Sequence, residues 1–246
     1  MIRSVLIVLF SFLSFSVIAQ DSASVKKMKK DWSKVSLANR PKDHFLIQMG
    51  YNNWTKVPDS INNKGIHRSV NVYFMMDFPF KTDPRISVAI GTGVSSDNQY
   101  FKTTSIDIAG KLKNELTFKN VSDTTHFKKY KMQTTYLEAP IELRFTKDPE
   151  NPNKSFKGAV GVKIGTLVGA SVKGKNWVNS KGNLINGYTQ KEKSKTFINN
   201  TRMSIMGRVG YGIISIYASY QLNAFIKDGL GPDIRPMQIG ITISGL

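Results

Sequence analysis

The sequence predicts an all-β fold, an eight-stranded antiparallel up-and-down transmembrane β-barrel over residues 43–246. Three observations lead to this prediction. An export leader begins the chain, eight segments alternate apolar and polar residues, and the connections between those segments alternate between long and short. A polytopic helical membrane protein is excluded, because only 40% of the residues are hydrophobic and the mean hydropathy is −0.25.

Residues 1–19 have the three regions of a secretory signal peptide. Arg3 precedes an apolar run, and Val17 and Ala19 stand at the −3 and −1 positions of the expected cleavage site. The run is short for a membrane-spanning helix, so we expect the chain to be exported. Residues 20–42 follow as a basic N-terminal arm with seven Lys or Arg residues and two Asp residues.

From residue 43 onward, apolar and polar side chains alternate with the period of a strand that has two different faces. The alternation is clearest in residues 214–222, where Ile, Ile, Ala, Tyr and Leu share one face and Ser, Tyr, Ser and Gln share the other. The second face carries Gly, Ser or charges on nearly every segment, which suits a small barrel with a filled polar interior and an apolar exterior. The eight expected strands are residues 45–52, 70–78, 86–94, 136–145, 160–169, 203–210, 214–223 and 237–244.

The connections alternate in length, as in outer-membrane barrels with long external loops and tight periplasmic turns. The long connections are residues 55–65, 96–131, 173–200 and 225–235, and the short ones are residues 79–84, 147–154 and 211–213. Two further β-like runs, residues 105–109 and 112–118, fall within the second long connection. We interpret them as a hairpin above the membrane, and a ten-stranded barrel is the alternative.

Residues 136–144 read Tyr-Leu-Glu-Ala-Pro-Ile-Glu-Leu-Arg and open the fourth expected strand. This run resembles the Tyr-Leu-Glu-Ile-Pro-Leu strand of the PorT-like outer-membrane β-barrel family, and the glycine-rich residues 158–169 follow it. The resemblance extends over residues 43–246 and implies a location in the Gram-negative outer membrane. Most members have no established activity, and the namesake is a component of a protein-secretion system. Ala139 replaces the usual larger aliphatic residue, and the chain ends in Leu246 where such barrels usually end in an aromatic residue.

Charged side chains on the expected inward face are the candidate site residues. Charges in a narrow lumen of low dielectric constant are costly to bury unless they pair. They indicate either an ion path or a structural salt-bridge plug, and we favour the plug, because side chains just fill a barrel of this size. Pro140 is also expected to face inward and to bring either a bulge or a lost hydrogen bond in the strand ladder, and Gly161, Gly165 and Gly169 are expected to face the lumen. The candidates are Asp77, Glu138, Glu142, Arg144, Lys157, Lys163 and Arg208.

We expect no enzymatic activity, no metal and no cofactor. The chain has no cysteine, which excludes a thiol nucleophile and a cysteine-ligated metal. The three histidines, His44, His67 and His126, lack metal-ligand spacing. His126 lies near Ser122 and Asp123 in the sequence, so a lipid-modifying hydrolase or acyltransferase at the outer rim is one alternative function. A narrow pore and a soluble periplasmic β protein that binds an apolar ligand are the others.

The chain is strongly basic, with 35 Lys or Arg residues, 17 Asp or Glu residues and a net charge of +18. Residues 173–200 alone hold six Lys residues and one Glu residue. Outer-membrane lipid and lipopolysaccharide are therefore expected partners, because anionic surfaces attract lysine. Envelope or secretion-system proteins are further expected partners, and nucleic acid is not expected, because an exported chain rarely meets it. The sequence thus predicts a structural or interaction component of the envelope or of a secretion complex.

Aromatic residues gather near the ends of the expected strands, as they do in the interfacial girdles of membrane barrels. Such girdles mark the two boundaries between lipid tails and water. The residues expected in them are Tyr51, Trp54, Phe78, Phe80, Phe145, Phe156, Tyr211, Tyr220 and Phe225.

Overall fold

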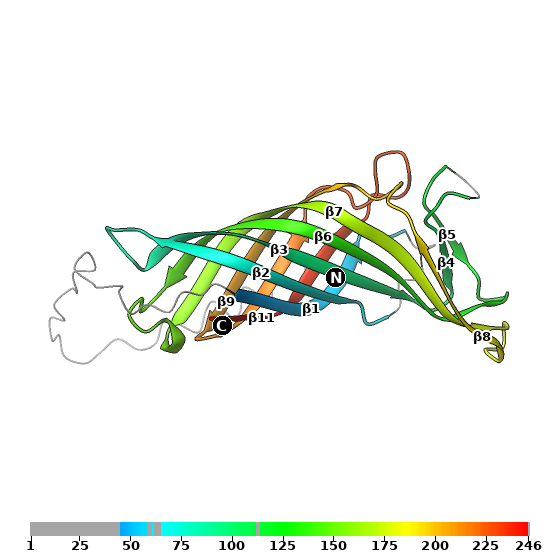
Figure 1. Cartoon of the computed structure of the whole chain (residues 1–246), viewed down its shortest axis with the longest axis horizontal. Helices are drawn as coiled ribbons and strands as arrows, with labels where there is room; N and C mark the ends of the chain where they lie inside the picture. Colours follow the sequence, from blue (N-terminus) through cyan, green and yellow to red (C-terminus); the bar gives the residue numbers. More distant parts are fainter. Residues whose placement is uncertain (1–44, 59–60, 62–64, 112–113, 246) are drawn as a thin grey trace, which may run out of the picture. The chain divides into compact units, whose positions relative to one another are not determined.

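Eight antiparallel strands close into a barrel in the computed structural model, which describes residues 45–58, 61, 65–111 and 114–245. Each strand pairs with its neighbour, and the last pairs with the first, so the predicted eight-stranded barrel is confirmed (Figure 1). The barrel strands are β1 (Phe45–Thr55), β2 (Arg68–Pro79), β3 (Ile86–Phe101), β6 (His126–Thr146), β7 (Phe156–Val178), β9 (Thr201–Tyr211), β10 (Ile214–Gln221) and β11 (Arg235–Ser244). The expected signal peptide, basic arm and His44 lie outside the described residues.

Three more strands lie outside the ring. β4 (Thr104–Asp107) and β5 (Thr117–Asn120) form a separate two-stranded sheet, so the hairpin interpretation is confirmed and the ten-stranded alternative is wrong. β8 (Leu184–Lys193) is not among the strands predicted from the sequence, and it pairs only with the far end of β7. The one helical turn among the described elements is a 3₁₀ turn at Pro152–Lys154, and no described helix is long and apolar enough to span a membrane.

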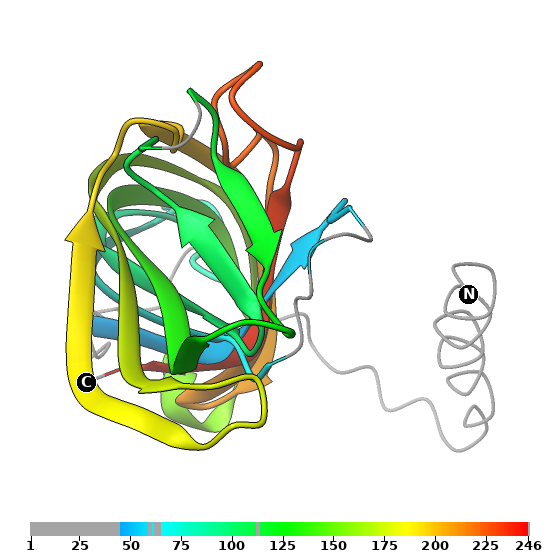
Figure 2. The ribbon, with the colours of Figure 1, turned by 90° about the vertical axis from the view of Figure 1, so that its right-hand side faces the viewer.

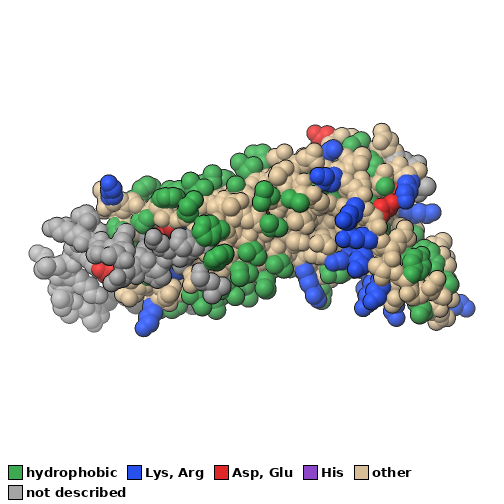
Figure 3. Space-filling model, viewed as in Figure 1, with side chains coloured by type: hydrophobic (Ala, Val, Ile, Leu, Met, Phe, Trp, Pro, Cys, Tyr) green, Lys and Arg blue, Asp and Glu red, His purple; other side chains and the backbone are tan. Residues whose placement is uncertain are grey.

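The strands follow the predicted alternation of faces. Outward residues such as Val72, Phe74 and Ile241 are exposed, while inward residues such as Gln48 and Thr242 are buried. Exposed apolar side chains therefore cover the middle of the barrel (Figure 3). An apolar exterior around a polar interior is the arrangement that a lipid environment requires.

A bulge in β7 changes the predicted faces of its glycines. The register between β6 and β7 shifts after Thr135, because Thr135 pairs with Gly169 and Tyr136 pairs with Leu167. The extra residue, Val168, reverses the alternation beyond it, so the prediction that Gly169 faces the lumen is wrong.

Pro140 faces inward as predicted, and of the two alternatives expected at this residue the bulge is absent, which leaves the lost ladder hydrogen bond. Pro140 is buried and pairs with Lys163 without a shift of register. The bulge lies instead at the Thr135/Tyr136 step described above. Proline lacks an N–H group to donate, and here its place in the β6–β7 ladder leaves the register intact.

β3, β6 and β7 are longer than a bilayer requires, with 16, 21 and 23 residues. They continue beyond the exposed apolar side chains of the middle of the barrel, here called the apolar belt. β8 pairs with the far end of β7 (Figure 1). The connections expected at residues 96–131 and 173–200 are therefore largely strand. We call the part formed by residues 126–134, 170–178 and 184–193 the extension.

A hydrophobic core, here called the outer core, lies under the long connections. Trp54 and Phe225 belong to it, so the prediction that they lie in an interfacial girdle is wrong. Their rings are 5.3 Å apart, and the β4–β5 hairpin crosses the end of the barrel nearby (Figure 2). The outer core comprises Trp54, Ile61, Phe101, Ile106, Ile108, Leu116, Tyr130, Met132, Tyr136, Leu167, Ala170, Val172, Phe197, Ile198, Phe225, Ile226 and Ile234.

Candidate functional site

Arg202 is at the centre of the first cluster of buried charges in the lumen. Its guanidinium donates to Asp97 Oδ2 at 2.5 Å and to Glu138 Oε1 at 3.1 Å. The second oxygen of Glu138 accepts from the Tyr73 hydroxyl at 2.5 Å and lies 3.7 Å from Lys163 Nζ. The four charged side chains are almost completely buried, so each cation is compensated by a carboxylate within the barrel.

Neutral side chains complete this first cluster. The face of the Tyr136 ring lies 3.8 Å from Arg202 Cζ, which adds a cation–π contact. Gln238 donates to Asp97 Oδ1 at 2.8 Å, and Asn71 donates to both Gln238 and Gln48 at 3.0 and 3.2 Å. Hydrogen-bonded polar side chains thus continue across the lumen from the charged cluster.

Glu142 organises a second cluster nearer the short turns. Its Oε2 accepts from Arg144 Nε at 2.8 Å and from Arg208 Nη2 at 3.1 Å. Arg144 also lies 3.8 Å from Asp77, which accepts from Ser87 Oγ at 2.7 Å. Of the seven candidate site residues, the structure therefore places Glu138 and Lys163 in the first cluster and Asp77, Glu142, Arg144 and Arg208 in the second, while Lys157 is buried in the wall of the barrel.

Asp97 and Arg202, which are central to the first cluster, are not among the site residues predicted from the sequence. Asp97 falls just beyond the strand expected at residues 86–94, and Arg202 falls just before the one expected at residues 203–210. Both residues continue the inward alternation of their strands. Extending each predicted strand by a few residues would have found them.

The histidines do not form a catalytic arrangement in the part of the chain that the structure describes. His67 is buried, and its Nδ1 accepts from the Tyr100 backbone N–H at 3.0 Å. His126 Nδ1 contacts the backbone oxygen of Thr124 at 2.9 Å, and no hydrogen bond joins His126 to Ser122 or Asp123 within the described residues. No cluster of three or more His, Asp or Glu side chains suited to a metal occurs among them either.

A family model described as an outer membrane protein beta-barrel domain matches residues 44–229. The chain belongs to this family. This outer-membrane barrel is similar to the crystal structure of Ail, the attachment invasion locus protein of Yersinia pestis, in complex with the heparin analogue sucrose octasulfate. The identity is 10%, the TM-score is 0.34, and the match covers 81% of this chain and 94% of that one. No curated protein matches the chain.

The extension of the outer-membrane barrel carries a row of lysines on its outer face. Lys131 on β6 pairs with Lys173 on β7, and Lys173 pairs with Lys191 on β8. Lys129 and Lys175 form the next pair along the same two strands. Residues directly opposite in a sheet share a face, and like charges in such pairs are destabilising. We call these five residues the lysine rows, and Lys and Arg side chains gather at this end of the surface (Figure 3).

Lys131 shows the mutual repulsion of the lysine rows. Burial lowers the pKa of Lys131, and the charges of Lys173 and Lys191 lower it further. Its Nζ donates to Asn98 Oδ1 at 2.7 Å, and this neutral amide oxygen does not compensate the positive charge. A site of this kind suits an anionic partner from outside the chain.

Proposed function

We propose that this outer-membrane barrel is a non-conducting, non-enzymatic interaction component of the envelope. The observation that carries the proposal is the pair of ion-paired clusters in the lumen, centred on Arg202 and Glu142. The outer core supports it, because apolar side chains fill the space where the lumen would open outward. Envelope or secretion-system proteins are the protein partners that the PorT-like resemblance implies.

Lipopolysaccharide is the proposed partner of the lysine rows. Leu137 is the last exposed apolar residue of β6 before the extension, and Lys131 follows six residues further along the strand. That separation is about 20 Å along the strand, or about 15 Å above the apolar belt at the tilt usual for membrane barrels. The lysines thus stand at a height suited to the phosphate groups of the lipopolysaccharide headgroup and inner core.

Planar-bilayer recordings test the non-conducting part of the proposal. We expect the purified barrel to give no unitary current steps over a range of voltages in which a porin control conducts. The ion pairs of Arg202 and Glu142 would have to break to admit hydrated ions. Regular current steps that depend on protein insertion would contradict a plug and would favour a narrow pore.

Lipopolysaccharide that copurifies with the barrel tests the proposed partner. The triple variant Lys131→Gln, Lys173→Gln and Lys191→Gln removes one complete row, and we expect the bound lipopolysaccharide to fall several-fold. The control variant replaces three exposed lysines outside the lysine rows, Lys119, Lys154 and Lys181, and has the same change in net charge. An equal loss of bound lipopolysaccharide in both variants would show that only the net charge matters and would contradict a site at the lysine rows.

A further inference from the structure

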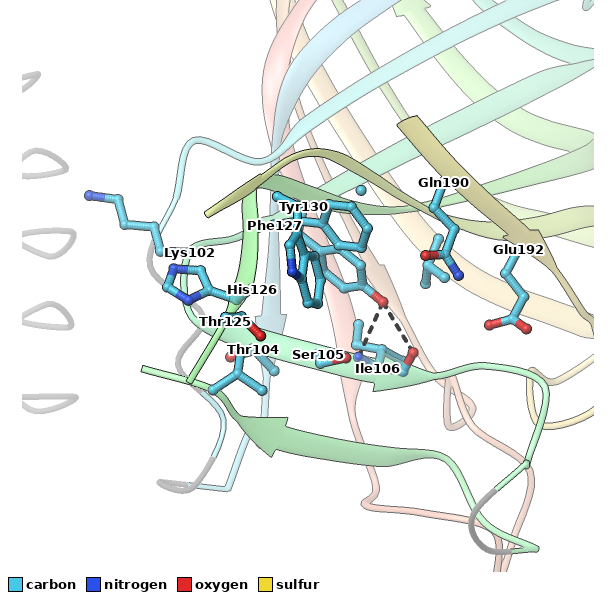
Figure 4. A pocket seen from close by; sticks show the side chains of 14 residues that line it. Lys102, Thr104, Ser105, Ile106, Thr125, His126, Phe127, Tyr130, Gln190 and Glu192 are labelled. Atoms are coloured by element: carbon cyan, nitrogen blue, oxygen red, sulfur yellow. Dashed lines mark hydrogen bonds between the residues drawn. The ribbon is translucent and has the colours of Figure 1, made fainter. Parts of the chain in front are cut away.

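A pocket of about 220 Å³ opens between the β4–β5 hairpin and the extension (Figure 4). Phe127, Tyr130 and Trp177 line it with aromatic rings, and Gln190 and Glu192 face it from β8. We propose that this pocket binds a single pyranose ring of a saccharide. The inference goes beyond the proposed function, because neither the lumen clusters nor the lysine rows take part in it.

The aromatic wall is held in place before any ligand arrives. The Phe127 ring meets Trp177 edge-on at 4.7 Å and stacks on Tyr130 at 6.2 Å. The Tyr130 hydroxyl donates to Ile106 O at 3.1 Å and accepts from Ile106 N at 3.2 Å, which ties β6 to the β4–β5 hairpin. Phe127 and Trp177 remain half-buried. A pyranose presents an apolar C–H face to such rings, so a rigid aromatic surface favours it.

The local sequence explains why the ring of Phe127 fits there. Gly174 lies opposite Tyr130 in the β6–β7 ladder, and a Cβ at this position would overlap the Phe127 ring. Gly174 also pairs with Gln190, and Val172 pairs with Glu192. Since paired residues share a face, this register turns Gln190 and Glu192 toward the pocket and leaves the lysines of the same strands on the opposite face.

The polar groups of the pocket match the hydroxyls of a sugar. The side chain of Gln190 makes no hydrogen bond with another described residue, so its amide can both donate and accept. One carboxylate oxygen of Glu192 lies 2.5 Å from Lys111 Nζ, and the other is available as an acceptor. Thr104 and Ser105 supply hydroxyl groups from β4. The amide of Gln190 can donate to one sugar hydroxyl, and the carboxylate of Glu192 can accept from a neighbouring hydroxyl.

The size and charge of the pocket narrow the ligand to an uncharged ring. Its volume is below the range of about 300–1,000 Å³ that is usual for drug-sized ligands, so it suits one ring. Lys102 and His126 lie on one side and Glu192 on the other, so the lining has no single sign of charge (Figure 4). A few polar groups around an aromatic wall are typical of small-molecule sites.

Titration of the folded barrel with monosaccharides tests the site. The protein is held in a phosphocholine detergent, because detergents with sugar headgroups would compete. Glucose, galactose, mannose and N-acetylglucosamine are titrated while amide NMR shifts are followed, with sorbitol as the open-chain control. We expect at least one pyranose to bind saturably with a Kd on the order of 1 mM, and sorbitol to leave the shifts unchanged.

Substitutions of pocket residues test whether the sugar binds in this pocket. We expect Trp177→Ala to weaken it at least tenfold, and Gln190→Ala, an exposed position, to weaken it several-fold. Glu192→Gln is compared with Lys111→Gln, which breaks the same ion pair but keeps the carboxylate. We expect Lys111→Gln to bind the sugar nearly as well as the wild type does. Lys173→Gln, on the opposite face of β7, is expected to bind as the wild type does.

Three results decide the inference. Saturable binding that Gln190→Ala and Trp177→Ala both weaken supports the site, and tighter binding of an oligosaccharide with the same terminal sugar identifies a glycan chain rather than a free sugar. Absence of saturable binding by every pyranose overturns it. Binding that none of the pocket variants changes also overturns it. Neither failure affects the plug or the lysine rows, which bilayer recordings and lipopolysaccharide copurification measure separately.

Discussion

Arg202 shows how a single residue depends on partners far away in the chain. Its guanidinium binds Asp97 of β3 and Glu138 of β6, which are 105 and 64 residues away. All three side chains are almost fully buried. Removal of one member of such a group leaves an uncompensated charge in a medium of low dielectric constant.

We predict that Arg202→Met destabilises the barrel by about 3–5 kcal/mol, because Asp97 and Glu138 lose a buried partner. Urea unfolding of the detergent-folded protein measures the change, with the gel shift between unboiled and boiled samples as a second readout. Arg235→Gln is the control, since its pair with Asp233 is exposed and we expect little effect on the unfolding midpoint. Equal stability of the two variants would contradict a central role for Arg202.

A second prediction at this scale concerns the titration of Lys131. Its pKa is lowered by burial, then by Lys173 and Lys191, so the folded state binds fewer protons than the unfolded chain between the folded and unfolded pKa values. Stability therefore rises as the pH increases through that interval, and the destabilising contribution is fully present below it. We expect Lys173→Gln to raise the Lys131 midpoint in an NMR titration of the lysine side chains. An unchanged midpoint would show that lysine repulsion has no effect there.

At the scale of the element, the bulge in β7 gives glycines of the same strand different surroundings. Gly161 pairs with Glu142, and a Cβ at Gly161 would overlap the backbone of Ile141 and Glu142 on β6. Gly169 lies beyond the extra residue, and a Cβ there would meet nothing within 4 Å. A single inserted residue thus separates Gly161, where the close approach of β6 requires a glycine, from Gly169, where a larger side chain would fit.

We predict that Gly161→Ala destabilises the barrel by about 1–3 kcal/mol, because the added methyl group forces β6 and β7 apart. Gly169→Ala is the matched variant, in the same strand with the same change, and should leave the unfolding midpoint unchanged or slightly higher. Thermal or urea unfolding in detergent compares the two. A larger loss for Gly169→Ala would mean that the bulge lies elsewhere in the strand.

At the scale of the whole barrel, the apolar belt separates two different ends. The short-turn end carries exposed aromatic residues, among them Phe145, Phe156 and Tyr211. The other end carries the extension, the lysine rows and the outer core. Aromatic residues favour the interface between lipid and water, and long connections of such barrels lie outside the cell. We therefore expect the extension to face outward.

Single cysteines test this orientation, because the chain has none of its own. Lys181→Cys places a thiol between β7 and β8, and Lys154→Cys places one in a short turn, and both positions are exposed. We expect a membrane-impermeant maleimide to label Lys181→Cys in intact cells and Lys154→Cys only after the outer membrane is permeabilised. The reverse pattern would place the extension in the periplasm.

The number of barrel strands and the faces of most of their residues were predictable, and the candidate site was predictable in part. Glu138, Glu142, Arg144 and Lys163 could be recognised as inward because alternation continues on both sides of them. The β8 strand could not be predicted, since residues 184–193 carry mainly polar residues on both faces and show no apolar alternation. It forms because the far end of β7 offers an unpaired edge.

The eight strands, the faces of most of their residues and the alternation of short and long connections follow from the amino-acid sequence. These properties depend on a period of two and on turn residues, which are local in the chain. Only the folded barrel shows which charges meet, where the bulge reverses a face, that Trp54 and Phe225 join one core, and that a pocket lies beside Trp177. Such contacts join residues distant in the chain, so they depend on the register of every strand and on the closure of the barrel.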